Sequence, residues 1–577
     1  MKKKLLPALI VTGLIILVVI IMGITALINK YTPTKKTEDL KEYFNISSDD
    51  EAALIVDNEL SDYKAKIIDK KIYVDYKFVH DSLNSRFYWD ANENVLLYTT
   101  ASDIISAAAD SNSYSVTKQT NDFGYPIVKA TSDSALIALD YVKQYSNITF
   151  KSYDDPARIV ITSKWDEIDS ATVSKSTQVR VKGGIKSPIL KEVKKDDKIT
   201  ILDSGDKWDK VATEDGVIGY IKSKALSESK KTKLTNPDYE EETFTHIKKD
   251  KDICLAWNQV TSQSANNKVP QVISSTKGIN VMSPTWFYLN DNNGNLADIA
   301  SKDYVSYCHS QGIEVWGLFS NFENTDVDAA YVLTHTSTRT TLINQIMSAA
   351  FNYELDGVNI DFENITEAAY GDSYIEFIRE LAIKCHNNGI SLSVDVTVPA
   401  SFNKFFNRSD MANFADYIVI MGYDEHYKGS DAGSVSSIPW VTEGVESTLK
   451  EVPADQIILG MPFYTRIWEL TPKEDDDAVT DTEDQSKYTV ASQVYSMDAA
   501  AAQLATNNAT AALDEESGQN YAEWSASNKL YKVWLEDSTS LEKRLKLVDD
   551  NKLAGAAFWK LGFENSSVWD TVIKYLD

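Results

Sequence analysis

The stretch LDGVNIDFENI, residues 355–365, places polar side chains at a spacing that suits acid–base chemistry. Asn359, Asp361 and Glu363 alternate with apolar residues, so a strand would carry all three on one face. Two carboxyl groups this close repel each other when both are ionised, so the pKa of one of them rises. A carboxyl that keeps its proton near neutral pH can protonate a leaving oxygen. If this face lines a cavity, the stretch predicts a general acid.

The surroundings of this stretch predict a (β/α)8 barrel over residues 244–577. Strand-like runs alternate with helix-like runs such as residues 339–353 and 373–389. Eight repeats of this unit are typical of a barrel whose chemistry lies at the C-terminal ends of its strands. The stretch is fourth of the eight, which places Glu363 at such an end. The expected strands lie within residues 253–260, 278–289, 313–321, 356–364, 390–400, 415–427, 457–468 and 553–563.

The connection between the seventh and eighth strands, about residues 470–553, is too long for an ordinary barrel connection. It contains a helix-like run and a hairpin-like run, which predict a small α+β insertion above the barrel mouth. Its acidic loop, residues 473–485, is interpreted as a solvated linker rather than a calcium site.

Residues 356–363, DGVNIDFE, resemble the signature D-G-x-[DN]-x-[DN]-x-E of family 18 glycoside hydrolases. Further features of that family follow in order along the chain. MGYDE on the sixth strand resembles its M-x-Y-D, and GMPFYTRIW on the seventh resembles its G-x-P-x-Y-x-R. Trp559 on the eighth strand stands where the family has the tryptophan that floors the sugar subsite.

The resemblance implies a reaction in which the substrate's own N-acetyl oxygen is the nucleophile. Glu363 would then protonate the leaving oxygen and later activate water. Asp361 would hold the acetamido N–H and stabilise positive charge, and Tyr423 would bind the acetamido oxygen. Met421 and Asp424 of the sixth-strand motif are expected to bind substrate. The catalytic pair is therefore Glu363 and Asp361.

Three further residues are expected to bind the sugar. Asn359 stands where many members of the family have Asp, which removes one charge beside Asp361. Trp559 and Trp286 are tryptophans at or near strand ends, where flat apolar faces at a barrel mouth suit stacking against sugars.

The implied substrate is a GlcNAc-containing polysaccharide, with cleavage at β-1,4 bonds and a retaining outcome. The third strand, GLFSNF, lacks the family's usual S-x-G-G, which departs most from the chitinases. The pattern is closer to the bacterial wall and spore-cortex branch, so peptidoglycan is the first expectation. Chitinase or endo-β-N-acetylglucosaminidase activity, a non-catalytic glycan-binding barrel, and a structural relic remain alternatives. The intact Glu363, Asp361 and Tyr423 count against the last two.

The N-terminus, residues 1–29, predicts a transmembrane anchor. Three lysines precede an uncharged run from Leu5 to about Ile28, long enough to cross a bilayer. The lysines favour the cytoplasmic side, so the bulk of the chain is expected outside the cell. A long signal peptide that is cleaved is the alternative, because such peptides also have an apolar core. The sequon at Asn364 follows Glu363 directly, and a glycan there would block a cleft, which favours a bacterial source.

Two small domains are expected between the anchor and the barrel. Residues 30–165 are interpreted as a stalk and a mixed α/β domain, which loosely resembles the copper amine oxidase N-terminal type. Residues 168–230 show short strands separated by turns, and resemble a bacterial SH3-like domain. Its local excess of lysine would suit an anionic wall polymer, and a plain spacer is the alternative. The expected fold class is therefore α/β, with the barrel preceded by these two domains and the helix.

The composition limits the other partners. The formal net charge is −27, which argues against nucleic acid, because phosphate binding needs clustered Lys and Arg. The three cysteines and six histidines show no HExxH or Cys-x-x-Cys spacing, so neither a metal nor a cofactor is expected. Oligomeric state cannot be predicted from this sequence.

Overall fold

The computed structural model describes residues 2–363, 365, 370–473 and 484–576. The sequon residues Asn364 and Thr366, and most of the acidic loop, lie outside the described residues. The chain divides into two compact units by its contacts. The first contains residues 1–87, 107–113 and 122–241, and the second contains residues 88–106, 114–121 and 242–577.

The first unit begins with helix α1 (Lys2–Tyr31). Its segment Pro7–Tyr31 is long and apolar enough to cross a membrane, and none of it is buried by the rest of the chain. A signal sequence near the N-terminus can satisfy the same test of length and composition. The helix therefore agrees with either a membrane anchor or a signal peptide.

Two sheets form the body of the first unit. One is mixed, with helices α3 (Tyr76–Ser82) and α4 (Leu139–Tyr145) and the strand order β11-β12-β1-β2-β3-β10-β9. The other is antiparallel, with the order β15-β14-β18-β17-β16-β13-β19. The first sheet contains β1 (Glu51–Val56), β2 (Glu59–Ile68), β3 (Lys71–Asp75), β9 (Val128–Ala130), β10 (Ala135–Ala138), β11 (Thr149–Tyr153) and β12 (Arg158–Thr162). The second contains β13 (Glu167–Thr172), β14 (Thr177–Arg180), β15 (Ile189–Val193), β16 (Lys198–Asp203), β17 (Trp208–Thr213), β18 (Ile218–Lys222) and β19 (Lys230–Lys233).

A third sheet has five strands. Its order follows the sequence, from β4 to β8. The strands are β4 (Phe87–Asp90), β5 (Val95–Thr99), β6 (Ile104–Ala108), β7 (Ser113–Val116) and β8 (Gln119–Asp122).

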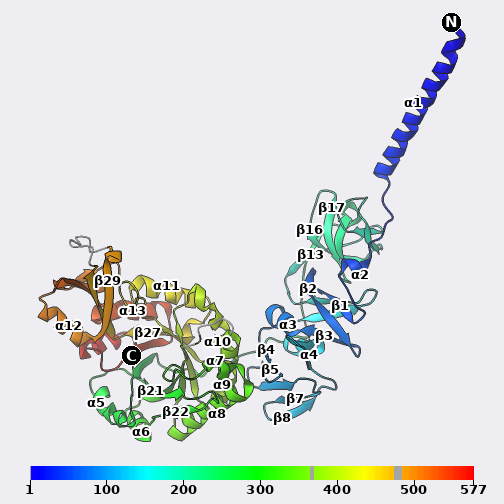
Figure 1. Ribbon diagram of the computed structural model, residues 1–577. Helices are drawn as coiled ribbons and strands as arrows, with labels where there is room; N and C mark the ends of the chain where they lie inside the picture. The colour runs from blue at the N-terminus through cyan, green and yellow to red at the C-terminus, as the bar shows by residue number, and fades with distance from the viewer. Residues whose placement is uncertain (1, 364, 366–369, 474–483, 577) are drawn as a thin grey trace. The chain divides into compact units, whose positions relative to one another are not determined.

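The second unit is built around a closed barrel of eight parallel strands in the described part of the chain, as the sequence predicts (Figure 1). Each strand pairs with its neighbours in chain order, and the first pairs with the last, which closes the ring. The strands are β20 (Ile253–Asn258), β21 (Val281–Leu289), β23 (Glu314–Ser320), β24 (Gly357–Asp361), β25 (Ser391–Thr397), β26 (Tyr417–Met421), β27 (Ile457–Pro462) and β33 (Gly555–Trp559).

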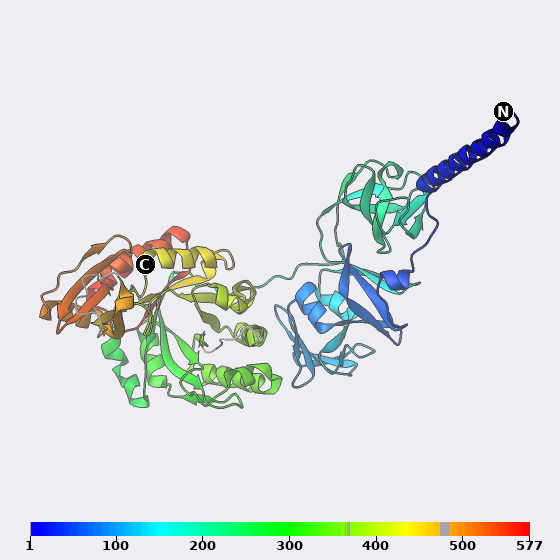
Figure 2. The same cartoon turned by 45° about the horizontal axis from the view of Figure 1, so that its top comes forward.

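Helices surround the barrel, and α8 and α9 lie side by side on its outside (Figure 2). They cover strand β24 because its apolar residues alternate with its polar ones: Val358 and Ile360 are fully buried in the core shared with the helices. Phe362 continues this face and stacks on Phe377 of α9, with ring centroids 5.4 Å apart. The helices are α5 (Val269–Ile273), α6 (Lys302–Ser310), α7 (Ala329–Thr334), α8 (Thr336–Tyr353), α9 (Gly371–His386), α10 (Arg408–Phe414), α11 (Ile438–Thr448), α13 (Ser538–Asn551) and α14 (Trp569–Val572).

Aliphatic and aromatic side chains together form the core inside the barrel, below the mouth. Trp316 of β23 is fully buried and stacks on Tyr417 of β26, with ring centroids 5.6 Å apart. Gly357, which opens the DGVNIDFE strand, faces Trp316, and a Cβ there would lie 2.6 Å from its ring. The glycine is therefore required by the close approach of the tryptophan.

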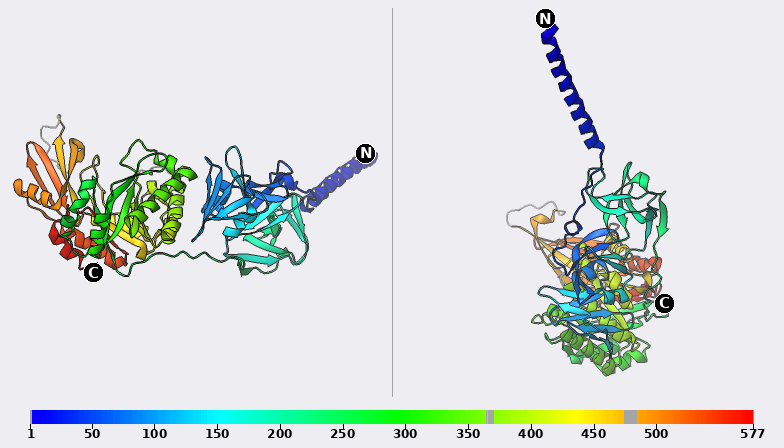
Figure 3. Two further views of the ribbon diagram at one scale, coloured as in Figure 1. Left: turned by 90° about the horizontal axis from the view of Figure 1, so that it is seen from below. Right: turned by 90° about the vertical axis from the view of Figure 1, so that its right-hand side faces the viewer.

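The insertion between β27 and β33 is a five-stranded sheet with one helix, coloured orange beside the barrel in Figure 3. It runs from Tyr464 to Leu535, whereas the sequence suggested about 470–553. The first strand follows β27 almost directly, and residues 538–551 form the barrel helix α13. Its elements are β28 (Tyr464–Pro472), β29 (Tyr488–Ser496), α12 (Met497–Thr506), β30 (Ala512–Asp514), β31 (Gln519–Ala526) and β32 (Lys529–Leu535).

Candidate active site

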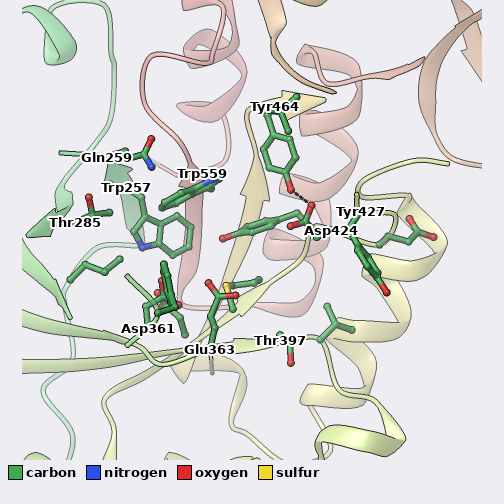
Figure 4. A pocket seen from close by; sticks show the side chains of 18 of the residues that line it. Trp257, Gln259, Thr285, Asp361, Glu363, Thr397, Asp424, Tyr427, Tyr464 and Trp559 are labelled. Carbon is green, nitrogen blue, oxygen red and sulfur yellow. Dashed lines mark hydrogen bonds between the residues drawn. The ribbon is translucent and has the colours of Figure 1, made fainter. Parts of the chain in front are cut away.

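A cavity of about 680 Å³ opens at the C-terminal ends of the barrel strands. Side chains from β20, β25, β26 and β33, the segment after β24, and the inserted strand β28 line it. Figure 4 shows Trp257, Asp361 and Glu363 directed into this space. This is the end at which barrels of this kind carry their chemistry.

Asp361 and Glu363 both line the cavity, as predicted. Asp361 is the last residue of β24 and is almost fully buried, whereas Glu363 follows the strand and is exposed. Desolvation raises the pKa of Asp361 well above its usual value, and Asp395, Glu363 and Glu323 raise it further by charge repulsion. Desolvation, followed by repulsion from Asp424 and Glu323, raises the pKa of Glu363. Both carboxyls therefore hold protons to higher pH than free ones.

Asn359 lies below this pair and does not line the cavity. It is fully buried, so the predicted role as a substrate-binding residue is corrected. Its Oδ1 accepts hydrogen bonds from Trp257 Nε1 and from Ser283 Oγ, both at 2.9 Å. Its Nδ2 donates to Ser393 Oγ at 3.0 Å and to Asp395 Oδ1 at 2.7 Å. Asn359 therefore ties four barrel strands together beneath the site.

Asp395 is a site residue that the sequence analysis missed. It lies on β25, lines the cavity, and is buried except for about 4% of its surface. Desolvation raises its pKa well above the usual value; the hydrogen bond from Asn359 opposes this, and repulsion from Glu363 adds to it. A signal was present, because the strand SLSVDVT alternates Ser391, Ser393 and Asp395 with apolar residues.

Strand β26 and the loop after it supply Met421, Tyr423 and Asp424, which all line the cavity as predicted. Tyr423 is half-buried, and desolvation raises its pKa well above the usual value. Asp424 has a φ of +61°, a left-handed conformation that Asp adopts more readily than most residues. Tyr464 of the insertion donates a hydrogen bond of 2.6 Å to its Oδ1 (Figure 4).

Two tryptophans form an aromatic wall of the cavity. Trp559 at the end of β33 and Trp257 on β20 both line it, with ring centroids 6.0 Å apart. Trp286 does not line the cavity, so its predicted role in binding sugar is corrected. It is fully buried against Tyr304 of α6, and its Nε1 donates to Asn266 Oδ1 at 2.8 Å. Ser283 and Thr285 take inward positions on β21, so Trp286, which follows Thr285, points outward.

The described residues contain no group of three or more His, Cys, Asp or Glu side chains placed to hold a metal ion. The chemistry available from the described side chains is therefore that of paired carboxyls and a tyrosine next to flat aromatic faces. These groups can transfer protons to and from a sugar that stacks on the tryptophans. A parallel barrel with such a mouth is the arrangement of a glycosidase.

Comparison with known proteins identifies the barrel more closely. Residues 316–564 match the family described as glycosyl hydrolases family 18. Most of the barrel therefore resembles family 18 glycosyl hydrolases, and the chain is similar to enzymes of the glycosidase class.

Three relatives illustrate the range of similarity. The uncharacterized glycosylase YvbX of Bacillus subtilis (strain 168) is 23% identical over 348 residues, which cover 56% of this chain and 95% of the relative. The cortical fragment-lytic enzyme of the same organism is 24% identical over 287 residues, covering 48% of this chain and 63% of the relative. The crystal structure of the Bacillus cereus spore cortex-lytic enzyme SleL has a TM-score of 0.50 at 18% identity. That match covers 60% of this chain and 79% of SleL, and it supports the fold.

Proposed function

We propose that the protein is a membrane-anchored, extracytoplasmic glycosidase that cleaves β-1,4 bonds next to N-acetylglucosamine, with peptidoglycan as its substrate. The observation that carries this proposal is the placement of Asp361, Glu363 and Tyr423 around one cavity beside Trp559. Such a set can bind an acetamido sugar and protonate the oxygen of the bond that joins it to the next sugar.

The proposed mechanism is substrate-assisted and retaining. Glu363 donates its proton to the glycosidic oxygen, and the C–O bond to the anomeric carbon breaks. The acetamido oxygen of the same sugar forms a bond to that carbon and gives an oxazolinium ion. Glu363, now ionised, takes a proton from a water molecule. The oxygen of that water attacks the anomeric carbon, and the bond from this carbon to the acetamido oxygen breaks, which opens the oxazolinium ring. Both anomeric displacements invert, so the original configuration is restored.

The roles proposed for the other residues are those that the resemblance to family 18 implies. Asp361 accepts a hydrogen bond from the acetamido N–H and stabilises the positive charge of the oxazolinium ion. Tyr423 donates a hydrogen bond from its hydroxyl group to the acetamido oxygen, and burial, which raises its pKa, keeps this hydroxyl protonated. Trp559 presents a ring face to the sugar, and the buried Trp257 packs against Trp559. Asp424, held by Tyr464, binds a sugar hydroxyl group.

Three observations favour a wall glycan as the substrate. The apolar helix α1 is suited to hold the chain at a membrane. The sheet of residues 167–233 ends in strand β19, whose residues are all exposed and three of which are lysines, which suits an anionic wall polymer. Two relatives are named for lysis of spore cortex or its fragments. Chitin and N-glycans are the alternative substrates, because both contain GlcNAc.

A direct assay separates these substrates. The full-length chain in detergent is incubated with peptidoglycan, chitin oligomers and an N-glycan, and new reducing ends are measured. We expect release from peptidoglycan, and a loss of about 100-fold or more in Glu363→Gln, because a positioned general acid contributes at least that much. Glu443→Gln, an exposed residue on α11, is the matched control. Binding without any Glu363-dependent product would instead support a glycan-binding barrel.

Cell fractionation tests the location. We expect the full-length chain in the membrane fraction, released only by detergent, with the barrel accessible to external protease in cells stripped of their wall. Mass spectrometry of the N-terminus distinguishes the two forms of α1. A chain that begins after the apolar run would show that the helix is a cleaved signal peptide.

A further inference from the structure

We propose that Asp395 is a positioning residue for Asp361, and that it supplies from strand β25 the carboxyl that the motif otherwise places at position 359. The proposal rests on the function proposed above, because Asp361 is the group that Asp395 would hold. Its basis is the set of hydrogen bonds that Asn359 makes, together with three carboxyls that line the cavity. These are Asp361 and Glu363 at the end of β24, and Asp395 on β25.

The orientation of the Asn359 amide is fixed by its neighbours. Trp257 Nε1 can only donate a hydrogen bond, so the Asn359 atom 2.9 Å away must be the oxygen. The nitrogen then faces β25, where it donates to Ser393 Oγ and to Asp395 Oδ1. Both amide protons are used in this way. Asn359 therefore has no donor left for Asp361, and its contacts hold Asp395 in one position.

Asp361 has an unmet requirement that Asp395 can satisfy. Its Oδ1 is buried and accepts no hydrogen bond among the described residues. A buried carboxyl oxygen without a donor is costly. Asp395 is the first charged neighbour that raises the pKa of Asp361, so the two groups interact strongly. Asp361 and Asp395 directly follow the paired residues Ile360 and Val394 of adjacent parallel strands, so the two carboxyls are neighbours at the strand ends. If they share a proton there, the protonated one can donate to the other.

The remaining groups around this pair are mostly acidic. Repulsion from the carboxylates Glu363 and Glu323 raises the pKa of Asp361, and Glu363 does the same to Asp395. The phenols of Tyr374 and Tyr423 face both aspartates, and Asp424 and Arg466 lie elsewhere on the cavity wall. The cluster therefore retains protons to higher pH than isolated carboxyls would, and each carboxyl that is removed lets the others ionise at lower pH.

The Asn359–Asp395 pair can be tested by exchanging its two residues. One member is an amide and the other a carboxyl, and they are joined by a hydrogen bond of 2.7 Å. Exchanging the two, Asn359→Asp with Asp395→Asn, reverses the direction of that bond and keeps the number of carboxyls. Asp at 359 can still accept from Trp257 and Ser283, and Asn at 395 can donate to it.

The test uses the full-length chain and four variants: Asp395→Asn, Asn359→Asp, the double exchange, and Asp455→Asn as an exposed control at the other end of the barrel. The values of kcat and KM are measured against pH on a fluorogenic chitooligosaccharide and on peptidoglycan fragments. We expect Asp395→Asn to lower kcat about 10- to 100-fold, the range known for outer partners that orient metal ligands. The alkaline limb of its kcat profile should move to lower pH while KM changes little. The double exchange should restore both kcat and the position of this limb to those of the unmodified chain.

A spectroscopic readout separates this inference from the proposed function. The infrared C=O stretch of a protonated carboxyl should be present at neutral pH in the unmodified chain and be reduced in Asp395→Asn. If neither substrate is cleaved by the unmodified chain, the proposed function fails while this band still reports on the proton. A folded Asp395→Asn with an unmoved alkaline limb, or a double exchange no better than the single variant, would overturn the positioning role.

Discussion

Tyr464 donates a hydrogen bond of 2.6 Å from its hydroxyl group to Oδ1 of Asp424. The first residue of the inserted sheet is thereby joined to the loop that follows barrel strand β26. Arg466, two residues further along β28, places its Nη2 3.7 Å from the same carboxyl oxygen. The insertion is therefore part of the cavity wall, and it holds a residue of the sixth-strand motif in place.

Removing this bond should impair the enzyme without unfolding it. We expect Tyr464→Phe to lower kcat/KM about tenfold or more, because a hydrogen bond to a charged group contributes about 1.5–3 kcal/mol. Tyr495→Phe, in the neighbouring strand β29, is the matched control. Within the part of the chain that the structure describes, the Tyr495 hydroxyl donates to Gln493 of its own strand. Equal kcat/KM values for both variants would show that the insertion does not support the site.

The acid cluster predicts a particular pH dependence. Desolvation and repulsion from Glu323 raise the pKa of Glu363, so its proton persists to higher pH than in a free glutamic acid. Activity should therefore be lost as pH rises through the raised pKa. Glu323→Gln removes a negative charge, lowers the pKa of Glu363 and Asp361, and should move the alkaline limb of kcat to lower pH. The Glu443→Gln control should leave the alkaline limb in place. An equally unmoved limb in Glu323→Gln would contradict the electrostatic coupling between Glu323 and Glu363.

The buried ion pair of Arg544 and Glu536 should dominate the stability of the region between insertion and barrel. Both side chains are fully buried, and the guanidinium makes two bonds of 2.7 Å to the carboxylate. Arg544→Met should lower the free energy of unfolding by about 3–5 kcal/mol, because it leaves a buried charge unpaired.

The double variant Arg544→Met/Glu536→Leu distinguishes lost packing from the unpaired charge. It should recover most of the stability in a urea titration, because an apolar pair of similar size can replace a buried ion pair. A double variant as unstable as Arg544→Met would contradict the charge explanation.

Trp559 and Trp286 should behave differently although both were expected to bind sugar. Trp559→Ala should lower kcat/KM about 10- to 100-fold, since base or ring stacking on an aromatic face contributes about 1–3 kcal/mol. Trp286→Phe should lower the melting temperature by loss of the bond to Asn266, with kcat and KM of the folded enzyme unchanged. A changed KM in Trp286→Phe would support the original prediction that Trp286 binds sugar.

The sequence by itself determined the barrel and the acid face of its fourth strand. Alternation is a local property of an extended chain, so Asn359, Asp361 and Glu363 could be placed on one face without knowledge of the fold. The spacing of eight such units then placed Glu363 at the strand end, where the structure also has it. The apolar N-terminal helix was equally readable, because the length of an uncharged run is a local property too.

Only the tertiary structure decided which distant residues meet in the site. Asp395 joins Asn359 across 36 positions, and Tyr464 joins Asp424 across 40, because the pairing register of neighbouring strands and the path of the insertion set these distances. The same register turns Trp286 outward and seals Asn359 beneath the mouth. How deeply a side chain lies inside a barrel depends on how all of its strands close, so it cannot be predicted from the sequence of one strand.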